Sequence, residues 1–194
     1  DHNFTTYYFI EKFDREEIFN LNKKINIIYR NYHQNKIEKT IKEINNFCKN
    51  TNRKLFISNN LKISKKIFLS NDISKAIQCG FDGVYLPSFN KLGKFYNLPL
   101  KNNFKIIGSA HNIREVMIKK KQGCQEIFVS PIFKTYKKRY LNIIKFNLIN
   151  LDNKTKIIAL GGINQKNFKK LAMTKSEGFA SISWIKKTAT TKVG

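Results

Sequence analysis

The sequence lacks long hydrophobic runs and has little cysteine. No apolar run approaches the roughly 20 residues that a membrane-spanning helix needs. The first residues, DHNFTTYYFIEKFD, contain neither the basic nor the apolar segment of a secretory signal. The three cysteines, Cys48, Cys79 and Cys124, are widely spaced and form no CxxC pair. We interpret them as buried, reduced thiols of a cytoplasmic protein, which argues against a metal or redox role.

Acidic residues are scarce as well. The 13 Asp and Glu residues stand against 37 Lys and Arg, so the net charge is +24. Such a charge is typical of proteins that bind nucleic acid, an anionic membrane surface or phosphorylated metabolites. The lysines are scattered along the chain, however, and Lys, Asn and Ile are all encoded by A/T-rich codons. We therefore attribute most of the charge to an A/T-rich genome and keep a nucleic-acid-binding protein only as a second alternative.

Proline is rare, with three residues, and no Pro- or Ser-rich linker divides the chain. The 194 residues fit one domain, which we place at 1–194 with a frayed tail at 185–194. This length lies near the lower limit, about 200 residues, of a (β/α)8 barrel.

Short apolar runs rich in β-forming residues alternate with polar stretches of helical period. Eight of these runs predict strands, at 7–10, 25–30, 67–70, 83–86, 105–108, 126–130, 156–160 and 179–183. Helices are predicted at 15–22, 37–49, 73–79, 113–121, near 146–151 and at 165–175. Asp14, Asn112 and Asn164 are in position to cap three of them. The alternation predicts an α/β fold, a single-domain TIM (β/α)8 barrel, with a doubly wound open sheet as the alternative.

Two similar segments compete for the third strand. LFISNN at 55–60 and IFLSND at 67–72 carry nearly the same pattern. We favour the second, because the segment ISKAIQCGFDGV that follows it contains a short helix leading to the next strand. The first segment would then be an extra turn or a strand extension after the second helix.

The predicted carboxyl ends of the strands, where such barrels carry their sites, suit an anion. They are rich in small residues, hydroxyls and amides and poor in paired carboxylates, which argues against acid–base hydrolysis. In IIALGGINQKNF, Gly161 and Gly162 follow the predicted seventh strand, where backbone N–H groups and a helix N-terminus often bind phosphate. A glycine-rich turn without a ligand is the competing interpretation.

The loop SPIFKTYKKRY, after the predicted sixth strand, is a second candidate anion site. It supplies one hydroxyl, Thr135, and four cations, Lys134, Lys137, Lys138 and Arg139. Fixed cations and a hydroxyl can hold a diphosphate and stabilise it as a leaving group. A solvated basic loop is the competing interpretation.

Three segments resemble the thiamine phosphate synthase/TenI family. They are GFDGVYLPSFN, IIGSAHNIREVMIKKKQGCQEIFVSPIFKT, and IIALGGINQKNFKKL followed by EGFASIS. They keep the order and spacing of that family's motifs, and the resemblance spans about residues 25–185. It implies a TIM barrel and a transferase of thiamine biosynthesis that couples hydroxymethylpyrimidine diphosphate to thiazole phosphate, releases pyrophosphate and uses Mg²⁺. These two phosphorylated metabolites are the implied partners, without a membrane; association into homo-oligomers stays open.

The family's site residues transfer to this chain where the motifs match. Arg30 in IIYRNY matches an arginine that contacts the diphosphate, and Ser109 matches the serine of the SAH motif. Thr135 and Lys138 match the threonine and lysine of PIFxTxTK, and Gly162 matches a glycine at the thiazole phosphate. The resemblance implies catalytic roles for Arg30, Ser109 and Lys138. It implies substrate binding by Arg30, Ser70, Ser109, Thr135, Lys137, Lys138, Gly161, Gly162, Ile182 and Ser183.

The metal site departs most from the family. Its two aspartates correspond to Asn90 and, in the gapless register, to Asn71, whereas a shift of one residue would place Asp72 there. We name Asn71, Asp72 and Asn90 as the implied metal positions. Neutral amides attract a hard dication less than carboxylates do. We hypothesise that the lysines of the 134–139 loop compensate for the lost charge.

A few residues bear on whether the chain resembles the synthase branch or the TenI branch of the family. The TenI branch, a thiazole tautomerase, uses a histidine where this chain has Pro131. His111, the last residue of the SAH motif, is more often an indirect contributor than a base. Tyr85 and Trp184 are interpreted as packing at the rim. A non-coupling, TenI-like thiazole phosphate-binding protein or tautomerase is therefore the first alternative to the synthase.

Overall fold

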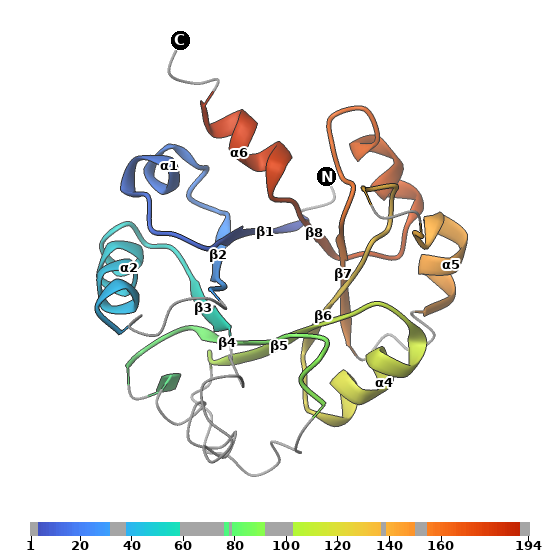
Figure 1. The fold of residues 1–194 in the computed structure, drawn as a ribbon, viewed down its shortest axis with the longest axis horizontal. Helices are drawn as coiled ribbons and strands as arrows, with labels where there is room; N and C mark the ends of the chain where they lie inside the picture. The colour runs from blue at the N-terminus through green and yellow to red at the C-terminus, as the bar shows by residue number, and fades with distance from the viewer. Residues whose placement is uncertain are drawn as a thin grey trace.

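The eight parallel strands close into a barrel in chain order (Figure 1). The computed structural model describes residues 4–31, 38–58, 76–77, 79–91, 103–136, 139–149 and 155–190. The strands are β1 (Thr5–Ile10), β2 (Asn26–Tyr29), β3 (Leu55–Ser58), β4 (Gly83–Leu86), β5 (Lys105–Ala110), β6 (Glu126–Val129), β7 (Lys156–Leu160) and β8 (Gly178–Ala180). Pairing of Thr5 with Gly178 joins β1 to β8 and closes the cylinder. The predicted TIM barrel is therefore confirmed, and the open sheet is excluded.

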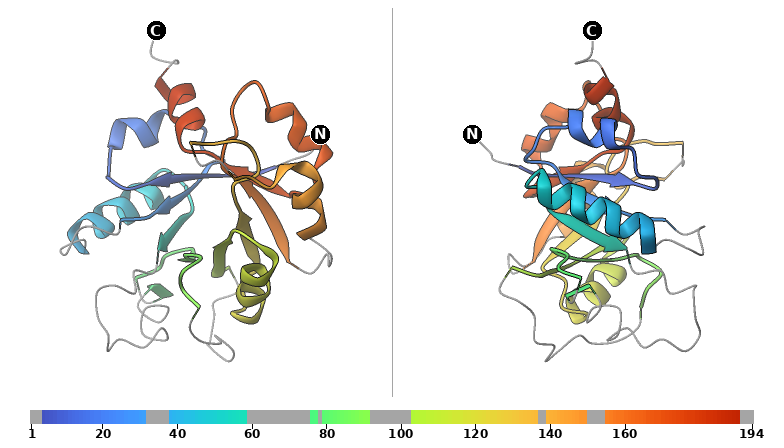
Figure 2. Two further views of the ribbon diagram at one scale, coloured as in Figure 1. Left: turned by 45° about the vertical axis from the view of Figure 1, so that its right-hand side comes forward. Right: turned by 90° about the vertical axis from the view of Figure 1, so that its left-hand side faces the viewer.

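Helices surround this barrel on its outside (Figures 1 and 2). Within the described ranges they are α1 (Arg15–Asn20), α2 (Glu38–Asn50), α4 (Ile113–Lys121), α5 (Asn142–Ile149), the 3₁₀ helix η2 (Phe168–Met173) and α6 (Ser183–Thr190). Asp14 and Asn112 cap α1 and α4, because their side chains accept from the main-chain N–H groups of Glu17 and Glu115. In the part of the chain that the structure describes, no helix has the length and apolarity to cross a bilayer.

Aromatic side chains fill the interior of the barrel. Alternate strand residues point inward, as the pleat requires, and form one cluster: Tyr7, Phe9, Ile28, Phe56, Tyr85, Ile107, Phe128, Ile158 and Ala180. The Phe128 ring meets Tyr7 edge-on at 4.9 Å, and Phe9 meets Tyr85 at 5.3 Å. Tyr85 thus packs inside the barrel and not at the rim, while Trp184 packs outside, against Phe168 and Phe179.

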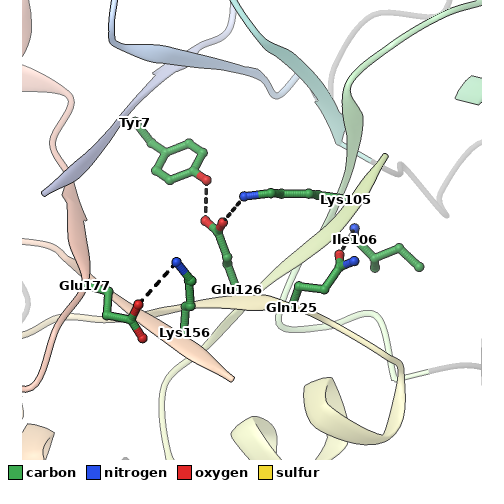
Figure 3. Close-up of polar contacts among 7 residues, drawn as sticks. All are labelled: Tyr7, Lys105, Ile106, Gln125, Glu126, Lys156 and Glu177. Carbon is green, nitrogen blue, oxygen red and sulfur yellow. Dashed lines mark hydrogen bonds and ion pairs between the residues drawn. The ribbon is translucent and has the colours of Figure 1, made fainter. Parts of the chain in front are cut away.

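The floor of the barrel holds a buried carboxylate (Figure 3). Glu126, at the amino end of β6, is 2% exposed; it accepts from the Tyr7 hydroxyl and from Lys105 Nζ at 2.5 Å. Burial, and then the neighbouring carboxylate, raise the pKa of Tyr7, so its hydroxyl stays protonated and donates. The network links β1, β5 and β6 at the end of the barrel opposite the carboxyl ends of the strands.

The third strand is Leu55–Ser58, so the prediction of 67–70 was wrong. After α2, four residues return the chain to the barrel, where Leu55 pairs with Ile27 of β2 and Ile57 pairs with Val84 of β4. The twin segments share one apolar pattern, so only the ladder partners on both sides decide between them. Residues 67–70 lie outside the described residues.

Two further predictions fail near the C-terminus. β8 ends at Ala180 and not at 183, and residues 183–190 form α6 and not a frayed tail. Thr-rich SWIKKTAT has modest helix propensity, but tertiary contacts hold it. Ile185 is buried, and Lys186 Nζ lies 2.9 Å from Glu17 Oε2 of α1. The helix predicted at 165–175 is reduced to η2, and the one near 146–151 is α5, which begins at Asn142.

The free cysteines differ from the prediction at one position. Cys48 and Cys124 are buried, as expected, but Cys79 is exposed. Burial raises the pKa of each buried thiol from 9.0 to about 12, although Arg53 and Lys119 respectively oppose the rise. Burial also lowers the pKa of Lys119 from 10.5 to about 8.

We expect stability to fall as the pH rises from 9 to 10. In this window the unfolded chain loses protons from Cys48 and Cys124 and, in part, from Tyr7 and Tyr8, whereas the folded chain keeps them because burial raises the pKa of all four groups. Each of these groups therefore lowers the free energy of unfolding as the pH rises. Lys119 acts in the opposite direction, because the folded chain releases its proton first. The net slope of about one proton corresponds to about 1.4 kcal/mol per pH unit. Urea denaturation at several pH values measures it. Cys124→Ala should reduce the slope to about half and Cys79→Ala should leave it unchanged; equal slopes in all three proteins would contradict the argument.

Candidate active site at the carboxyl ends of the strands

Arg30 lies at the mouth of the barrel, directly after β2. Its main-chain N–H donates to Ile10 O at 2.8 Å and so extends the β1–β2 ladder by one residue. Its guanidinium lies 5.0 Å from the centre of the Phe9 ring and 3.6 Å from Glu11 Oε1, and its side chain is 24% exposed. The stacking contact and the ion pair hold this cation at the rim, where it can meet an anion entering from solvent.

Serine hydroxyls lie above the aromatic interior, at the carboxyl ends of the strands. Ser58, Ser109 and Ser130 each follow an interior aromatic or aliphatic residue by two positions, so alternation turns their side chains toward the barrel axis. All three are buried, and Ser130 N donates to Ala110 O, which carries the ladder to the end of β6. The predicted Ser109 therefore lies at the mouth. Ser58 occupies the place on the third strand that the sequence assigned to Ser70, which lies outside the described residues.

Gly161 and Gly162 are required by close packing against the next loop. Both have left-handed backbones, with φ of 90° and 74°. A Cβ at Gly162 would lie 2.6 Å from Phe133 O and 2.7 Å from Lys134 O, and one at Gly161 would lie 2.8 Å from Pro131 Cβ. Phe133 N also donates to Gly161 O. The glycines thus fit the loop after β7 tightly against the loop after β6.

The loop after β8 joins the same corner. Ser181 Oγ donates to Ile163 O at 3.3 Å, which ties the β8 loop to the residues after Gly162. Ile182 and Ser183 are exposed, and Ser183 begins α6. A helix N-terminus beside a glycine-rich turn presents main-chain N–H groups and a positive dipole end. The Ser181–Ile163 bond thus places the start of the segment that contains Ile182 and Ser183 beside the residue that follows Gly162.

The basic loop after β6 is described only in part. Thr135 is partly buried, whereas Lys134 and Arg139 are exposed. Leu141 N donates to Pro131 O and Asn142 N to Ile132 O, so the base of the loop is closed beside Gly162. Lys137 and Lys138 lie outside the described residues, and their predicted roles stay predictions.

His111 is oriented toward the β6 loop. Its Nδ1 lies 2.9 Å from Ser130 O and 3.2 Å from Ser130 Oγ, and its main-chain N–H donates to Glu115 Oε2. Glu115 N in turn donates to Asn112 Oδ1, so the histidine belongs to the cap of α4. These contacts agree with an indirect role, in which His111 fixes Ser130 and the start of the β6 loop.

The residue at the implied metal position does not fit a metal ligand. Asn90 is 0% exposed, and its main-chain carbonyl oxygen accepts from Lys119 Nζ at 2.6 Å and from Gln122 Nε2 at 3.2 Å. A dication here would meet a neutral amide and a neighbouring ammonium group, which repels it. Asn71 and Asp72 lie outside the described residues, and their assignment rested on a third strand at 67–70, which is wrong. The described residues contain no cluster of three acidic, histidine or cysteine ligands.

Two residues, Ser58 at the rim and Lys119 beneath it, were not found from the sequence. Ser58 was hidden by the twin segments, although LFISNN carried the necessary pattern. Lys119 is one of 37 basic residues, and no local signal marks it as buried. Two of its three acceptors, Pro87 O and Asn90 O, lie on a segment that only the fold brings to it, whereas the third, Gln122 Oε1, is three residues away.

Comparisons with known proteins agree with these motifs. A family model described as thiamine monophosphate synthase matches residues 17–185. A thiamine-phosphate synthase of Prochlorococcus marinus is 32% identical over 141 residues, 67% of this chain and 35% of the relative. Another, of Clostridioides difficile, is 30% identical over 127 residues, 63% of this chain and 60% of the relative. The matched part thus spans less than two thirds of either relative.

Solved structures agree on the fold. A thiamine phosphate pyrophosphorylase from Pyrococcus furiosus superposes with a TM-score of 0.64 at 18% identity, over 97% of this chain and 93% of that one. An HpcH/HpaI aldolase from Desulfitobacterium hafniense gives 0.66 at 9% identity, over 99% and 92%. Because an aldolase scores as well, the likeness establishes the barrel alone and does not choose a reaction. The family model matches most of the sequence, residues 17–185, and the chain therefore belongs to the thiamine monophosphate synthase family.

Proposed function

We propose that this protein is a thiamine phosphate synthase, a transferase that couples hydroxymethylpyrimidine diphosphate to thiazole phosphate and releases pyrophosphate. The observation that carries the proposal is the gathering of a fixed arginine, buried hydroxyls and a glycine–helix corner at one end of the barrel. The family match over residues 17–185 supports it. Two anionic substrates need two anion sites within one mouth, and the cation and the glycine–helix corner at the rim support this proposal.

The proposed division of the mouth follows the charges. Arg30 and Ser109, together with Thr135, Lys137 and Lys138 of the basic loop, would hold the diphosphate and stabilise the charge that it gains on leaving. Gly161, Gly162, Ile182 and Ser183 would hold the thiazole phosphate through main-chain N–H groups at the start of α6. The substrates then face each other across the barrel axis.

The proposed reaction needs little acid–base chemistry. The bond between the pyrimidine methylene carbon and the diphosphate oxygen breaks, and the oxygen keeps the electron pair. The resulting carbocation is captured by the lone pair of the thiazole nitrogen, which forms the new carbon–nitrogen bond. No proton moves, so the protein's task is to stabilise the leaving anion, align the two reactants and exclude water. The buried Asn90 and the Lys119 ammonium group beside it do not support a metal ion in these steps. Mg²⁺ is implied by the resemblance alone.

The test is direct product formation. Purified protein is incubated with both substrates, with and without Mg²⁺, and thiamine phosphate and pyrophosphate are measured. We expect equal amounts of both products. Arg30→Ala should lower kcat/KM about 100-fold, because the leaving charge loses a positioned cation. Arg15→Ala, which changes an exposed arginine of α1, is the matched control and should retain activity. A lack of both products in the wild type would refute the proposal.

A non-coupling protein that binds thiazole phosphate is the second candidate. The burial of Asn90 favours it, since the implied metal position cannot serve the diphosphate. Calorimetry separates the two: thiazole phosphate binding without diphosphate binding would favour the second candidate. Tautomerase activity is not favoured, because Pro131 stands at the position of the required histidine.

A further inference from the structure

Lys119 is a fully buried cation beneath the rim. It lies on α4 outside the barrel, it is 0% exposed, and its side chain passes over Gly108 of β5. A Cβ at Gly108 would lie 2.8 Å from Lys119 Cδ, so only glycine leaves room for this path. Lys119 Nζ faces oxygen acceptors on every side that it can reach with a hydrogen, which is the environment that an ammonium group needs.

Three oxygens surround this ammonium group. Lys119 Nζ donates to Pro87 O at 2.8 Å, to Asn90 O at 2.6 Å and to Gln122 Oε1 at 2.9 Å. Three donors therefore meet three acceptors, which is the full capacity of a lysine. Two of the acceptors are the first and last carbonyls of the turn after β4, and Asn90 N closes that turn on Pro87 O at 3.0 Å.

This arrangement resembles what a bound cation does for a loop: carbonyl oxygens from separate positions converge on one positive charge. We propose that Lys119 is a positioning residue whose ammonium group, and not a divalent cation, holds the turn Pro87–Asn90 at the carboxyl rim. The turn follows β4 directly and lies next to Ser109, because Leu86 pairs with Gly108. Its role in substrate binding rests on the proposed function; its dependence on Lys119 does not.

The exchange of the Asn90 amide hydrogen tests the proposal, since this hydrogen bonds to one of the carbonyls that Lys119 holds. Lys119→Met keeps the length of the side chain and removes its donors. We expect the Asn90 amide to exchange at least about tenfold faster in this variant, while amides of β7 change little. Lys121→Met, an exposed lysine of the same helix, is the matched control and should leave the exchange unchanged.

Magnesium titration of the wild type is the second measurement, and it needs no variant to fold. We expect about 10 mM Mg²⁺ to change the exchange of the Asn90 amide by less than about twofold, because the turn already holds its cation. Clear slowing of exchange by Mg²⁺ would overturn the proposal. Unchanged exchange in a folded Lys119→Met protein would overturn it as well.

Kinetics with the two proposed substrates distinguish positioning from mere stability. Lys119→Met should raise the KM for the pyrimidine diphosphate about tenfold and change kcat less than about threefold, because a displaced turn weakens substrate binding. A fall in kcat at unchanged KM would indicate only a smaller folded fraction and would contradict the positioning role. If the wild type forms no thiamine phosphate, the proposed function fails, whereas the exchange and magnesium results still decide the role of Lys119.

Discussion

Gly162→Ala should lower kcat/KM for thiamine phosphate formation at least about 100-fold, because a displacement of about 1 Å in a positioned site can cost that much. The added methyl group would lie 2.6 and 2.7 Å from two main-chain oxygens of the β6 loop, Phe133 O and Lys134 O. Neither oxygen belongs to a flexible side chain, so the β6 and β7 loops must move apart. This motion would separate the basic loop, which is proposed to hold the diphosphate, from the start of α6, which is proposed to hold the thiazole phosphate.

Stability should fall together with activity in this variant. The left-handed φ of 74° adds about 1–2 kcal/mol for any residue with a Cβ, and overpacking adds about 1–3 kcal/mol. Urea denaturation measures the sum. Assays below the unfolding transition keep the two effects apart, because the folded fraction is then known.

Gly123→Ala is the matched control for Gly162→Ala. Gly123 also has a left-handed φ, of 81°, but a Cβ there would meet no atom within 4 Å. It follows α4, away from the glycine pair. We expect a loss of about 1 kcal/mol and full activity. If both variants lose activity to the same degree, the backbone conformation and not the contact between the loops is responsible, and the site as described is wrong.

Glu126→Ala should destabilise the fold by about 3 kcal/mol or more. The change removes the acceptor of the buried Tyr7 hydroxyl and the partner of Lys105, and it leaves a cavity in the barrel floor. Removing one member of a buried pair typically costs about 3–5 kcal/mol. Lys105 is 38% exposed and can turn toward solvent, so the lower end of that range is expected. Urea denaturation at pH 7 measures the loss.

Figure 3 also contains the control for this prediction. Lys156 and Glu177 form an ion pair at 3.3 Å in the same region, but their side chains are 54% and 47% exposed. Glu177→Ala should cost at most about 1 kcal/mol, since water replaces the lost partner. Tyr7→Phe should cost about 1–2 kcal/mol, because the carboxylate keeps Lys105. An equal loss for Glu126→Ala and Glu177→Ala would show that the floor network contributes nothing beyond a surface pair.

The sequence alone determined the architecture because its signals are local. Apolar runs of strand length and polar stretches of helical period set β4, β7 and α4 to the residue, and Asp14 and Asn112 cap helices as their positions indicate. The motifs around Ser109, Thr135 and Gly162 fixed the family for the same reason. The alternation of side chains along a strand and the 3.6-residue period of a helix both depend on residues that are close in sequence. A short stretch of sequence is therefore enough to predict these elements.

Only the tertiary structure decided the third strand, the C-terminal helix and the buried charges. LFIS and IFLS have the same alternation, and the ladders with β2 and β4 chose the first. Lys119 is buried because carbonyls 32 and 29 residues away meet it, and Tyr7 reaches Glu126 across 119 residues. A charge can be buried only where the fold supplies its partners, and a short stretch of sequence contains no record of partners so distant.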